Sequence, residues 1–133
     1  MLIFVDTGAF LALYRKRDQY YRQAADTWAK LEPPFITSSH ITAELATLLA
    51  RQVGWVEAVD RVTDVYASPH IAVIGSDRED ELEALRWMRK YAGQRVSFTD
   101  CVSFALMRRH RIRRAFTFDR HFRLAGYEVI GLK

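Results

Sequence analysis

The chain has 133 residues, of which 50% are hydrophobic, and it carries a formal net charge of +4. This length is typical of one domain with its own core, and no apolar stretch approaches the roughly 18 residues of a membrane-spanning helix, so we expect a single cytoplasmic domain over residues 1–133 without membrane contact. The single cysteine, Cys101, excludes an internal disulfide framework and a cysteine-rich zinc site, and we expect it to be a small buried side chain.

Five short apolar runs are rich in β-branched or aromatic residues and are predicted to be strands. Between them lie segments with apolar residues at three- and four-residue spacing, which is typical of amphipathic helices. In chain order, the sequence predicts a strand at 2–5, a helix at 24–31, a strand at 35–37, helices at 41–48 and 56–65, a strand at 71–74, helices at 82–88 and 102–106, and strands at 115–118 and 129–130.

Start and stop signals accompany several of these helices. Ser76 and Glu79 have the spacing of a capping box, and Gly93 and Gly126 are placed as helix ends. Strands that alternate with helices indicate a mainly parallel sheet, and near-continuous apolar strands are what burial on both faces requires. The sequence therefore predicts a three-layer α/β/α sandwich with about five short strands.

Four acidic residues lie where functional groups collect in such a fold, because ligands bind outside the carboxyl ends of parallel strands. Asp6 directly follows the first strand and Asp119 directly follows the fourth, so we expect both to point into one crevice. Glu44 shares a helix face with apolar residues, where an unpaired carboxylate is costly. Asp100 opens the helix that precedes the fourth strand.

Local capping is the competing interpretation for three of these acids. Asp6 and Asp119 can cap the helices that follow them, and Ser97 with Asp100 has capping-box spacing. Glu44 lies in mid-helix and caps nothing, although a small rotation of the helix would place it on the surface. The joint pattern of four acids is more informative than any one of them.

Other enzymes also carry an aspartate near the end of a first strand. Aspartic proteases share the Asp-Thr-Gly sequence at 6–8, but they are all-β proteins with strands ahead of that turn, and only residues 1–5 precede it here. Phosphatases of the haloacid-dehalogenase type need a second aspartate where this chain has Gly8, and a receiver domain needs a lysine after a late strand.

The order and surroundings of the four acids resemble PIN domains. The segments that carry the resemblance are the one around Asp6, Ser38–Leu45, Ser97–Cys101 and Thr117–Phe122. More narrowly, the chain is similar to VapC-type toxins of prokaryotic toxin–antitoxin pairs, over essentially its whole length. The resemblance implies the PIN fold, a metal-dependent endoribonuclease that acts on RNA, Mg²⁺ or Mn²⁺ as cofactor, a homodimer, and a small antitoxin protein as partner.

The resemblance also implies roles for individual residues. By this match Asp6, Glu44, Asp100 and Asp119 are the catalytic and metal-binding acids. Thr7 and Thr117 match hydroxyl positions that flank these acids, and we expect them to contact the substrate. The alternative is a PIN domain that serves as an RNA- or protein-binding adaptor without cleavage, and the presence of all four acids argues against it.

Crowded carboxylates repel one another, and a hard divalent cation relieves that repulsion. Mg²⁺ prefers oxygen ligands and keeps several waters, which suits a site made only of Asp and Glu. A bound metal can activate a water and neutralise the scissile phosphate, so we expect in-line hydrolysis of an RNA phosphodiester. We assign Asp6 and Asp100 as the most direct ligands, with Glu44 and Asp119 completing the site directly or through waters.

Positive charge is concentrated in the last third of the chain. Residues 1–85 hold 8 Lys/Arg against 13 Asp/Glu, whereas residues 86–133 hold 12 against 3. Such a patch favours a polyanion, so we predict that it binds the RNA backbone beside the acids; a solvated helix end is the alternative. The arginines concerned are Arg108, Arg109, Arg111, Arg113 and Arg114. His110, His121 or an exposed aromatic side chain could contact bases of the RNA, but for the histidines we expect surface or packing roles.

The tryptophans fall at helical positions and are predicted to lie in the core or an interface. Residues 55–66 carry valines at 56, 59, 62 and 65, and core packing is the expected use of this stripe. A groove for an antitoxin helix and one side of a dimer are the alternatives, because all three bury an apolar surface. The sequence does not identify the RNA that is cleaved.

Overall fold

The computed structural model describes residues 1–132. Its strands are short, and each lies where an apolar run predicts one to within a few residues. They are β1 Ile3–Val5, β2 Phe35–Ser38, β3 Ile71–Ile74, β4 Arg114–Thr117 and β5 Glu128–Gly131. The helices are α1 Thr7–Tyr14, α2 Tyr21–Lys30, α3 Ser39–Gln52, α4 Trp55–Ala67, α5 Arg78–Lys90, the short 3₁₀ helix η1 Ala92–Gln94, α6 Phe98–Arg109 and α7 His121–Leu124.

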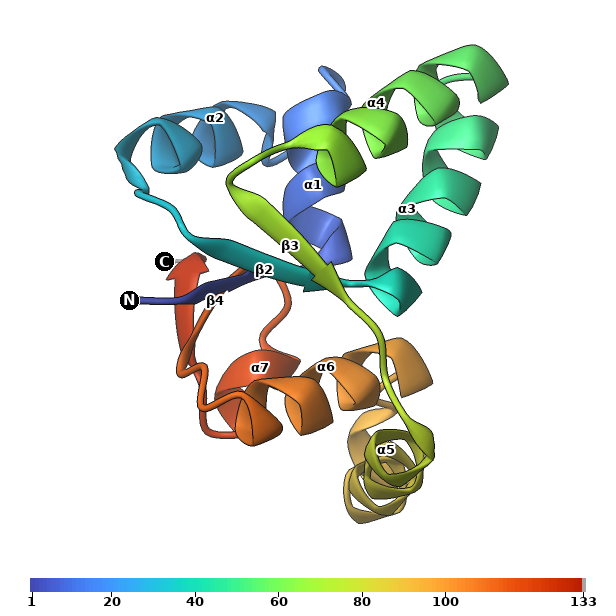
Figure 1. Ribbon diagram of the computed structural model, residues 1–133, viewed down its shortest axis with the longest axis vertical. Coiled ribbons are helices and arrows are strands. Elements are labelled where there is room, and N and C mark those ends of the chain that lie inside the picture. Colours follow the sequence, from blue (N-terminus) through green and yellow to red (C-terminus); the bar gives the residue numbers. More distant parts are fainter. Residues whose placement is uncertain (133) are drawn as a thin grey trace.

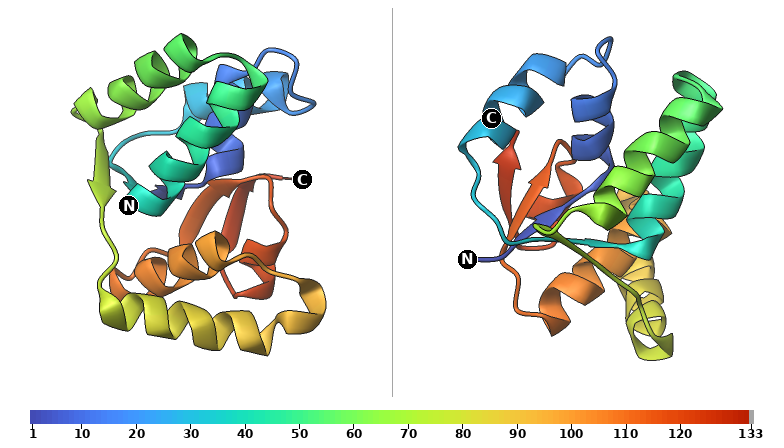
Figure 2. Two further views of the ribbon diagram at one scale, coloured as in Figure 1. Left: turned by 90° about the vertical axis from the view of Figure 1, so that its right-hand side faces the viewer. Right: turned by 45° about the horizontal axis from the view of Figure 1, so that its top comes forward.

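The five strands form one parallel sheet in the order β3-β2-β1-β4-β5. Helices α1 to α4 cover one face of the sheet, and α5 to α7 cover the other (Figure 1). The three layers are also visible when the molecule is turned, with the green and teal helices on one side and the yellow and orange helices on the other (Figure 2). The predicted three-layer α/β/α fold is therefore confirmed.

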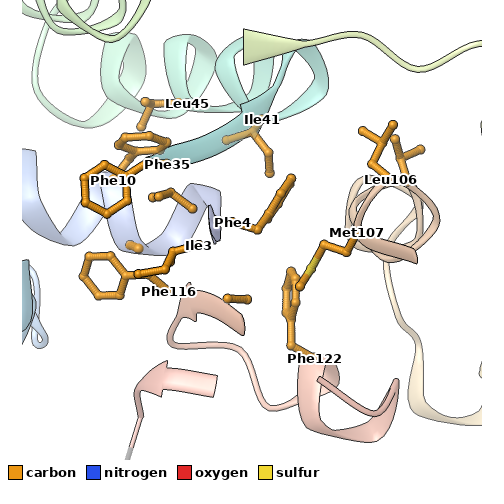
Figure 3. Close-up of a cluster of buried hydrophobic side chains, with 14 of the residues drawn as sticks. Ile3, Phe4, Phe10, Phe35, Ile41, Leu45, Leu106, Met107, Phe116 and Phe122 are labelled. Carbon is orange, nitrogen blue, oxygen red and sulfur yellow. The ribbon is translucent and has the colours of Figure 1, made fainter. Parts of the chain in front are cut away.

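The core lies on both sides of the central strand β1, whose three residues are all buried. Phe4 is fully buried in this strand, and Figure 3 shows it among side chains from α1, α3, α6 and α7. Phe10 of α1 and Leu45 of α3 pack near Phe35, while Met107 of α6 lies beside Phe122 of α7 (Figure 3). Burial of each such side chain contributes about 1.5–3 kcal/mol, so this core fixes the position of β1 and of the residue that follows it.

Two helices were not indicated by apolar spacing. Helix α1 is almost entirely apolar, and its buried residues include Ala9, Phe10 and Ala12. A helix that is apolar on every side has no periodic stripe, so spacing cannot mark it. Helix α7 has four residues, too few to show a period.

The ends of the helices differ in detail from the prediction. The capping box of α5 is one residue later than expected and pairs Asp77 with Asp80, while Ser76 donates to Glu81 instead. Gly126 follows α7 with φ of +96°, as expected of a helix end. The left-handed residue after η1 is Arg95, with φ of 56°, rather than Gly93.

The expectation of core packing is wrong for part of α4. Trp55 is 77% exposed, Val56 76% and Val59 62%, because α4 lies on the outside of α3 and turns one apolar side to solvent. Helix α5 likewise leaves Leu82 and Leu85 partly exposed. Trp28 and Trp87 do pack against the core, as predicted. None of the helices formed by residues 1–132 is long and apolar enough to cross a membrane.

Candidate active site

A cleft of about 760 Å³ opens at the carboxyl ends of the strands. The chain leaves β1 toward β2 on one side, whereas β4 pairs with β1 on the other, so the strand order reverses at this point. Ligands of open α/β sheets bind at such reversals. All four predicted acids line this one cleft: Asp6, Glu44, Asp100 and Asp119.

Asp6 directly follows β1 and is only 4% exposed. It occupies the N-cap position of α1, yet its carboxylate makes no capping hydrogen bond. Its Oδ2 instead accepts a hydrogen bond of 2.8 Å from Thr117 Oγ1, at the end of β4. The capping interpretation therefore fails for Asp6. Its carboxylate is held instead by a hydrogen bond from the neighbouring strand β4.

Thr117 links two of the acids. Its hydroxyl donates to Asp6 and also accepts from the backbone N–H of Asp119 at 3.0 Å. Asp119 Oδ1 in turn accepts from the backbone N–H of His121 at 2.8 Å. Asp119 thus has one oxygen in a local turn, which supports part of the capping interpretation, while its side chain still faces the cleft.

Asp100 lies in the first turn of α6 and is 8% exposed. The N-cap of this helix is Ser97, whose hydroxyl accepts from the Asp100 backbone N–H at 3.1 Å. The serine therefore does the capping, and the Asp100 carboxylate is left for other contacts. Its Oδ2 lies 3.8 Å from His121 Nδ1.

Glu44 comes from α3, on the opposite face of the sheet from Asp100. It is half-buried, and Leu48 one turn later lines the cleft with it. Thr7, also on the cleft wall, is 4% exposed, and its Oγ1 has no hydrogen-bond partner within residues 1–132. An unpartnered buried hydroxyl is costly to the fold, so the cleft wall contains a polar group whose hydrogen bonding is unsatisfied.

The acids perturb one another electrostatically. Burial raises the pKa of Asp6, and the charges of Asp119 and Glu44 raise it further, whereas hydrogen bonds from the Thr117 side chain and the Thr7 backbone lower it. Burial also raises the pKa of Asp100, and the neighbouring charges of Asp6 and Asp119 add to this effect. Burial is the larger cause of both pKa shifts, and no Lys or Arg of residues 1–132 forms an ion pair with these acids to oppose it.

His121 joins the acids, whereas the sequence predicted a surface or packing role for it. Its Nδ1 lies 3.2 Å from Asp119 Oδ1. Asp100, Asp119 and His121 each offer one ligand atom, and these atoms lie within 4.8 Å of one another, which suits a metal ion. The only signal in the sequence was the position of His121 two residues after Asp119, at the start of a helix too short to recognise.

The cleft carries two cations, but they are not the predicted ones. Arg95, in its left-handed conformation, and Arg120 both line the cleft and are exposed. Among residues 1–132, neither forms an ion pair with the four acids, and His121 is the one basic side chain with a nitrogen within 4 Å of them. Both arginines are therefore available to a phosphate.

The predicted arginine stretch lies elsewhere. None of its five members lines the cleft, because α6 runs from Asp100 to Arg109 away from it, over about 14 Å. Arg108 pairs with Glu83 of α5 at 3.5 Å, and Arg109 pairs with Asp80 at 2.9 Å. The remaining members are Arg111 and Arg113, which are exposed, and Arg114, which lies 3.9 Å from Glu128. The stretch is thus at the other end of the sheet from the acids.

Comparisons with known proteins agree with this geometry. The PIN domain model matches residues 3–126, and the chain therefore belongs to the PIN-domain family. It is 35% identical over 130 residues to the 23S rRNA-specific endonuclease VapC20 of Mycobacterium tuberculosis, with 95% of each chain covered. It is 27% identical over 121 residues to Ribonuclease VapC26 of the same organism, with 90% of this chain and 89% of that relative covered.

Solved structures give the same result. The crystal structure of Mycobacterium tuberculosis VapC20, described as a sarcin-ricin loop cleaving toxin, matches with a TM-score of 0.88 at 34% identity, covering 94% of this chain and 95% of that one. FitAcB from Neisseria gonorrhoeae matches with a TM-score of 0.71 at 18% identity over 96% of each chain, which shows the shared fold alone. Together these matches identify the chain as a nuclease of the PIN-domain family.

Proposed function

We propose that this chain is a divalent-metal-dependent endoribonuclease and the toxin of a toxin–antitoxin pair. The observation that carries the proposal is the meeting of Asp6, Glu44, Asp100 and Asp119 in one cleft, with no Lys or Arg of residues 1–132 paired to them. Unbalanced buried carboxylates are costly to a fold, so their presence favours a function that needs them.

The donor set suits a hard divalent cation. Asp6 and Asp100 are the most buried of the acids and are the proposed direct ligands, with Glu44 and Asp119 completing the site directly or through waters. Oxygen donors of this kind fit Mg²⁺, whereas the imidazole of His121 adds affinity for Mn²⁺. When bound, such an ion lowers the pKa of a coordinated water and offsets negative charge on a phosphate.

Other residues of the cleft would orient the acids and contact the substrate. Thr117 holds Asp6 by a hydrogen bond, so that carboxylate keeps one orientation as the substrate enters. Arg95 and Arg120 would contact phosphates on either side of the cleaved bond, because they are the cations of the cleft. The unpartnered Thr7 hydroxyl would donate to a substrate oxygen. Together these groups position the RNA for in-line hydrolysis.

Ribosomal RNA is the proposed substrate. The sequence alone left transfer, ribosomal and messenger RNA open. The identity of 35% across nearly the whole chain to a 23S rRNA-specific endonuclease favours the large-subunit ribosomal RNA. The match spans 95% of each chain, so the matched region includes the cleft and supports the substrate class as well as the fold.

An antitoxin is the proposed protein partner. Helices α3 and α4 pack side by side and form a groove of about 800 Å³ that is lined by Ala50, Trp55, Val59 and Val62, among others. The exposed apolar side chains here fit an amphipathic helix of a second protein. The predicted homodimer needs a further surface, and the exposed Leu82 and Leu85 of α5 offer one on the other layer of the molecule.

Cleavage of cellular RNA tests the proposal. The purified chain, shown to be folded and free of bound antitoxin, is incubated with total RNA and intact ribosomes in Mg²⁺, Mn²⁺ or EDTA. Asp6→Asn is compared with Asp26→Asn, a matched control because Asp26 is exposed and lies outside the cleft. We expect metal-dependent fragments from wild type and Asp26→Asn, and at least a hundredfold less product from Asp6→Asn.

The ends of the fragments identify the target. Ends that map to 23S rRNA would support the full proposal, whereas ends in transfer RNA would overturn the ribosomal substrate and leave the nuclease. Absence of cleavage with either metal, or equal cleavage by Asp6→Asn, would overturn the nuclease itself.

A further inference from the structure

Two aromatic side chains form part of the cleft wall beside the acids. Tyr20, just before α2, and Phe118, just after β4, line the same cleft as Asp6 and Asp119. Their rings are stacked in parallel, with centroids 4.4 Å apart and an interplanar angle of 4°. Both side chains are half-buried, so the pair presents aromatic surface to the cleft.

Contacts with neighbouring residues hold both Tyr20 and Phe118 in place. Phe118 contacts the fully buried ring of Phe116 edge to face, with centroids 5.9 Å apart. The backbone N–H of Tyr20 donates to Asp18 Oδ1 at 2.8 Å, which orders the loop that carries the tyrosine. Phe118 covers one face of the Tyr20 ring, so a further ring would have to stack on the opposite face.

The aromatic pair lies next to the acids of the cleft. Phe118 directly precedes Asp119, and Arg120 follows, so an aromatic ring, an acid and a cation follow one another along this cleft edge. Each RNA nucleotide offers a base that an aromatic ring can stack on and a phosphate that a cation can bind. Proteins that read unpaired RNA stack its bases on aromatic side chains and bind its phosphates with arginine.

We propose that Tyr20 and Phe118 form a nucleobase-stacking subsite, which holds one unpaired base of the RNA beside the cleaved phosphodiester. The inference rests on the proposed ribonuclease function and specifies its substrate further. A base must leave its helix to stack on Tyr20, so the subsite selects nucleotides in loops over those in duplexes. Stacking accepts every base, so the pair sets the structural context of the cut more than its sequence.

The experiment varies the protein and the substrate together. The substrate is a synthetic RNA hairpin that spans the cleavage site mapped in ribosomal RNA, with a series in which one nucleotide at a time is made abasic. Tyr20→Leu removes the aromatic ring and keeps an apolar side chain over Phe118. Tyr21→Leu is the matched control, because Tyr21 is the next residue and does not line the cleft.

We expect one abasic position at which wild type and Tyr21→Leu lose about tenfold in kcat/KM, mainly through KM. Tyr20→Leu should cleave the intact hairpin about tenfold less efficiently and show no further loss at that position. Its Mn²⁺ affinity and thermal midpoint should match those of wild type, which separates loss of stacking from damage to the site or the fold.

The outcomes separate this inference from the function on which it rests. If wild type cleaves RNA but Tyr20→Leu keeps the same abasic profile, the stacking subsite is wrong and the ribonuclease stands. A uniform loss in Tyr20→Leu on every substrate, with the abasic penalty unchanged, would also overturn it, because packing alone would then explain the stack. If wild type cleaves no RNA, the proposed function fails first.

Discussion

The cleft and the contact between α5 and α6 treat charge in opposite ways. Between α5 and α6, Arg109 pairs with the buried Asp80 at 2.9 Å and Arg108 pairs with Glu83. At the carboxyl ends, Asp6 and Asp100 are buried next to other acids with no arginine or lysine of residues 1–132 paired to them. The pairing of Asp80 with Arg109 shows that this fold can place an arginine beside a buried acid.

The unpaired cluster of acids, and not the paired one, indicates the functional site. A paired charge cluster supports the contact between α5 and α6 and needs nothing from outside. An unpaired cluster raises the pKa of its own members, mainly through burial, and is relieved only by a proton or a cation. Density of charge in the sequence does not distinguish the two, because the most basic stretch of the chain supplies Arg108 and Arg109 to the paired cluster.

The largest expected effect on this comparison comes from removing one carboxyl group of the cleft. In Asp100→Asn the metal-free protein should be more stable than wild type, and the gain should grow as the pH rises from 5 to 8. The raised pKa of Asp100 means that the folded state binds more protons than the unfolded state over this range, so wild type loses stability with increasing pH, by up to about 1.4 kcal/mol per unit.

Denaturant unfolding in EDTA at several pH values measures this gain. Asp26→Asn provides the control, since Asp26 is exposed and should show a flat difference from wild type. A gain for Asp100→Asn that is absent, or that shrinks with increasing pH, would contradict the view that the cleft is electrostatically unbalanced.

A smaller effect is expected from replacing arginines, and this test compares the cleft directly with the predicted arginine stretch. Replacing Arg95 and Arg120 by Gln should raise KM for a short RNA about tenfold, because these cations lie in the cleft. Replacing Arg111 and Arg113 by Gln should leave a short RNA unaffected and reduce the salt dependence of binding only for long RNA, whose backbone reaches the far end.

Cleavage assays on short and long substrates at several salt concentrations measure both pairs. The reverse result, in which Arg111 and Arg113 control KM for the short RNA, would restore the prediction that the arginine stretch lies at the functional site.

Much of the fold followed from the sequence because its signals are local. The strand at Ile71–Ile74 was predicted to the residue, since an apolar β-branched run between polar turns has few other solutions. The all-apolar α1 gave no periodic signal, and the exposure of Trp55 depends on whether α4 has a neighbour on its outer side. Such facts are decided by tertiary packing.

The site was predictable to a similar degree. The meeting of Asp6 and Asp119 follows from parallel topology, because strand ends share an edge. The places of Arg95, His121 and Tyr20 do not, because loops and short helices set them. The distance between the acids and the arginine stretch was missed because Asp100 and Arg109 are close in sequence yet lie at opposite ends of a straight helix.

Metal binding tests the central claim most directly, namely that the cleft acids are balanced by a divalent cation. Calorimetric titration of the purified chain with Mn²⁺ at pH 8, repeated in two buffers of different ionisation enthalpy, reports affinity and proton release together. We expect binding that releases protons and that is lost or weakened at least tenfold in both Asp6→Asn and Asp100→Asn, but not in Asp26→Asn. Mn²⁺ binding that is absent in wild type, or unchanged in both cleft variants, would contradict the account.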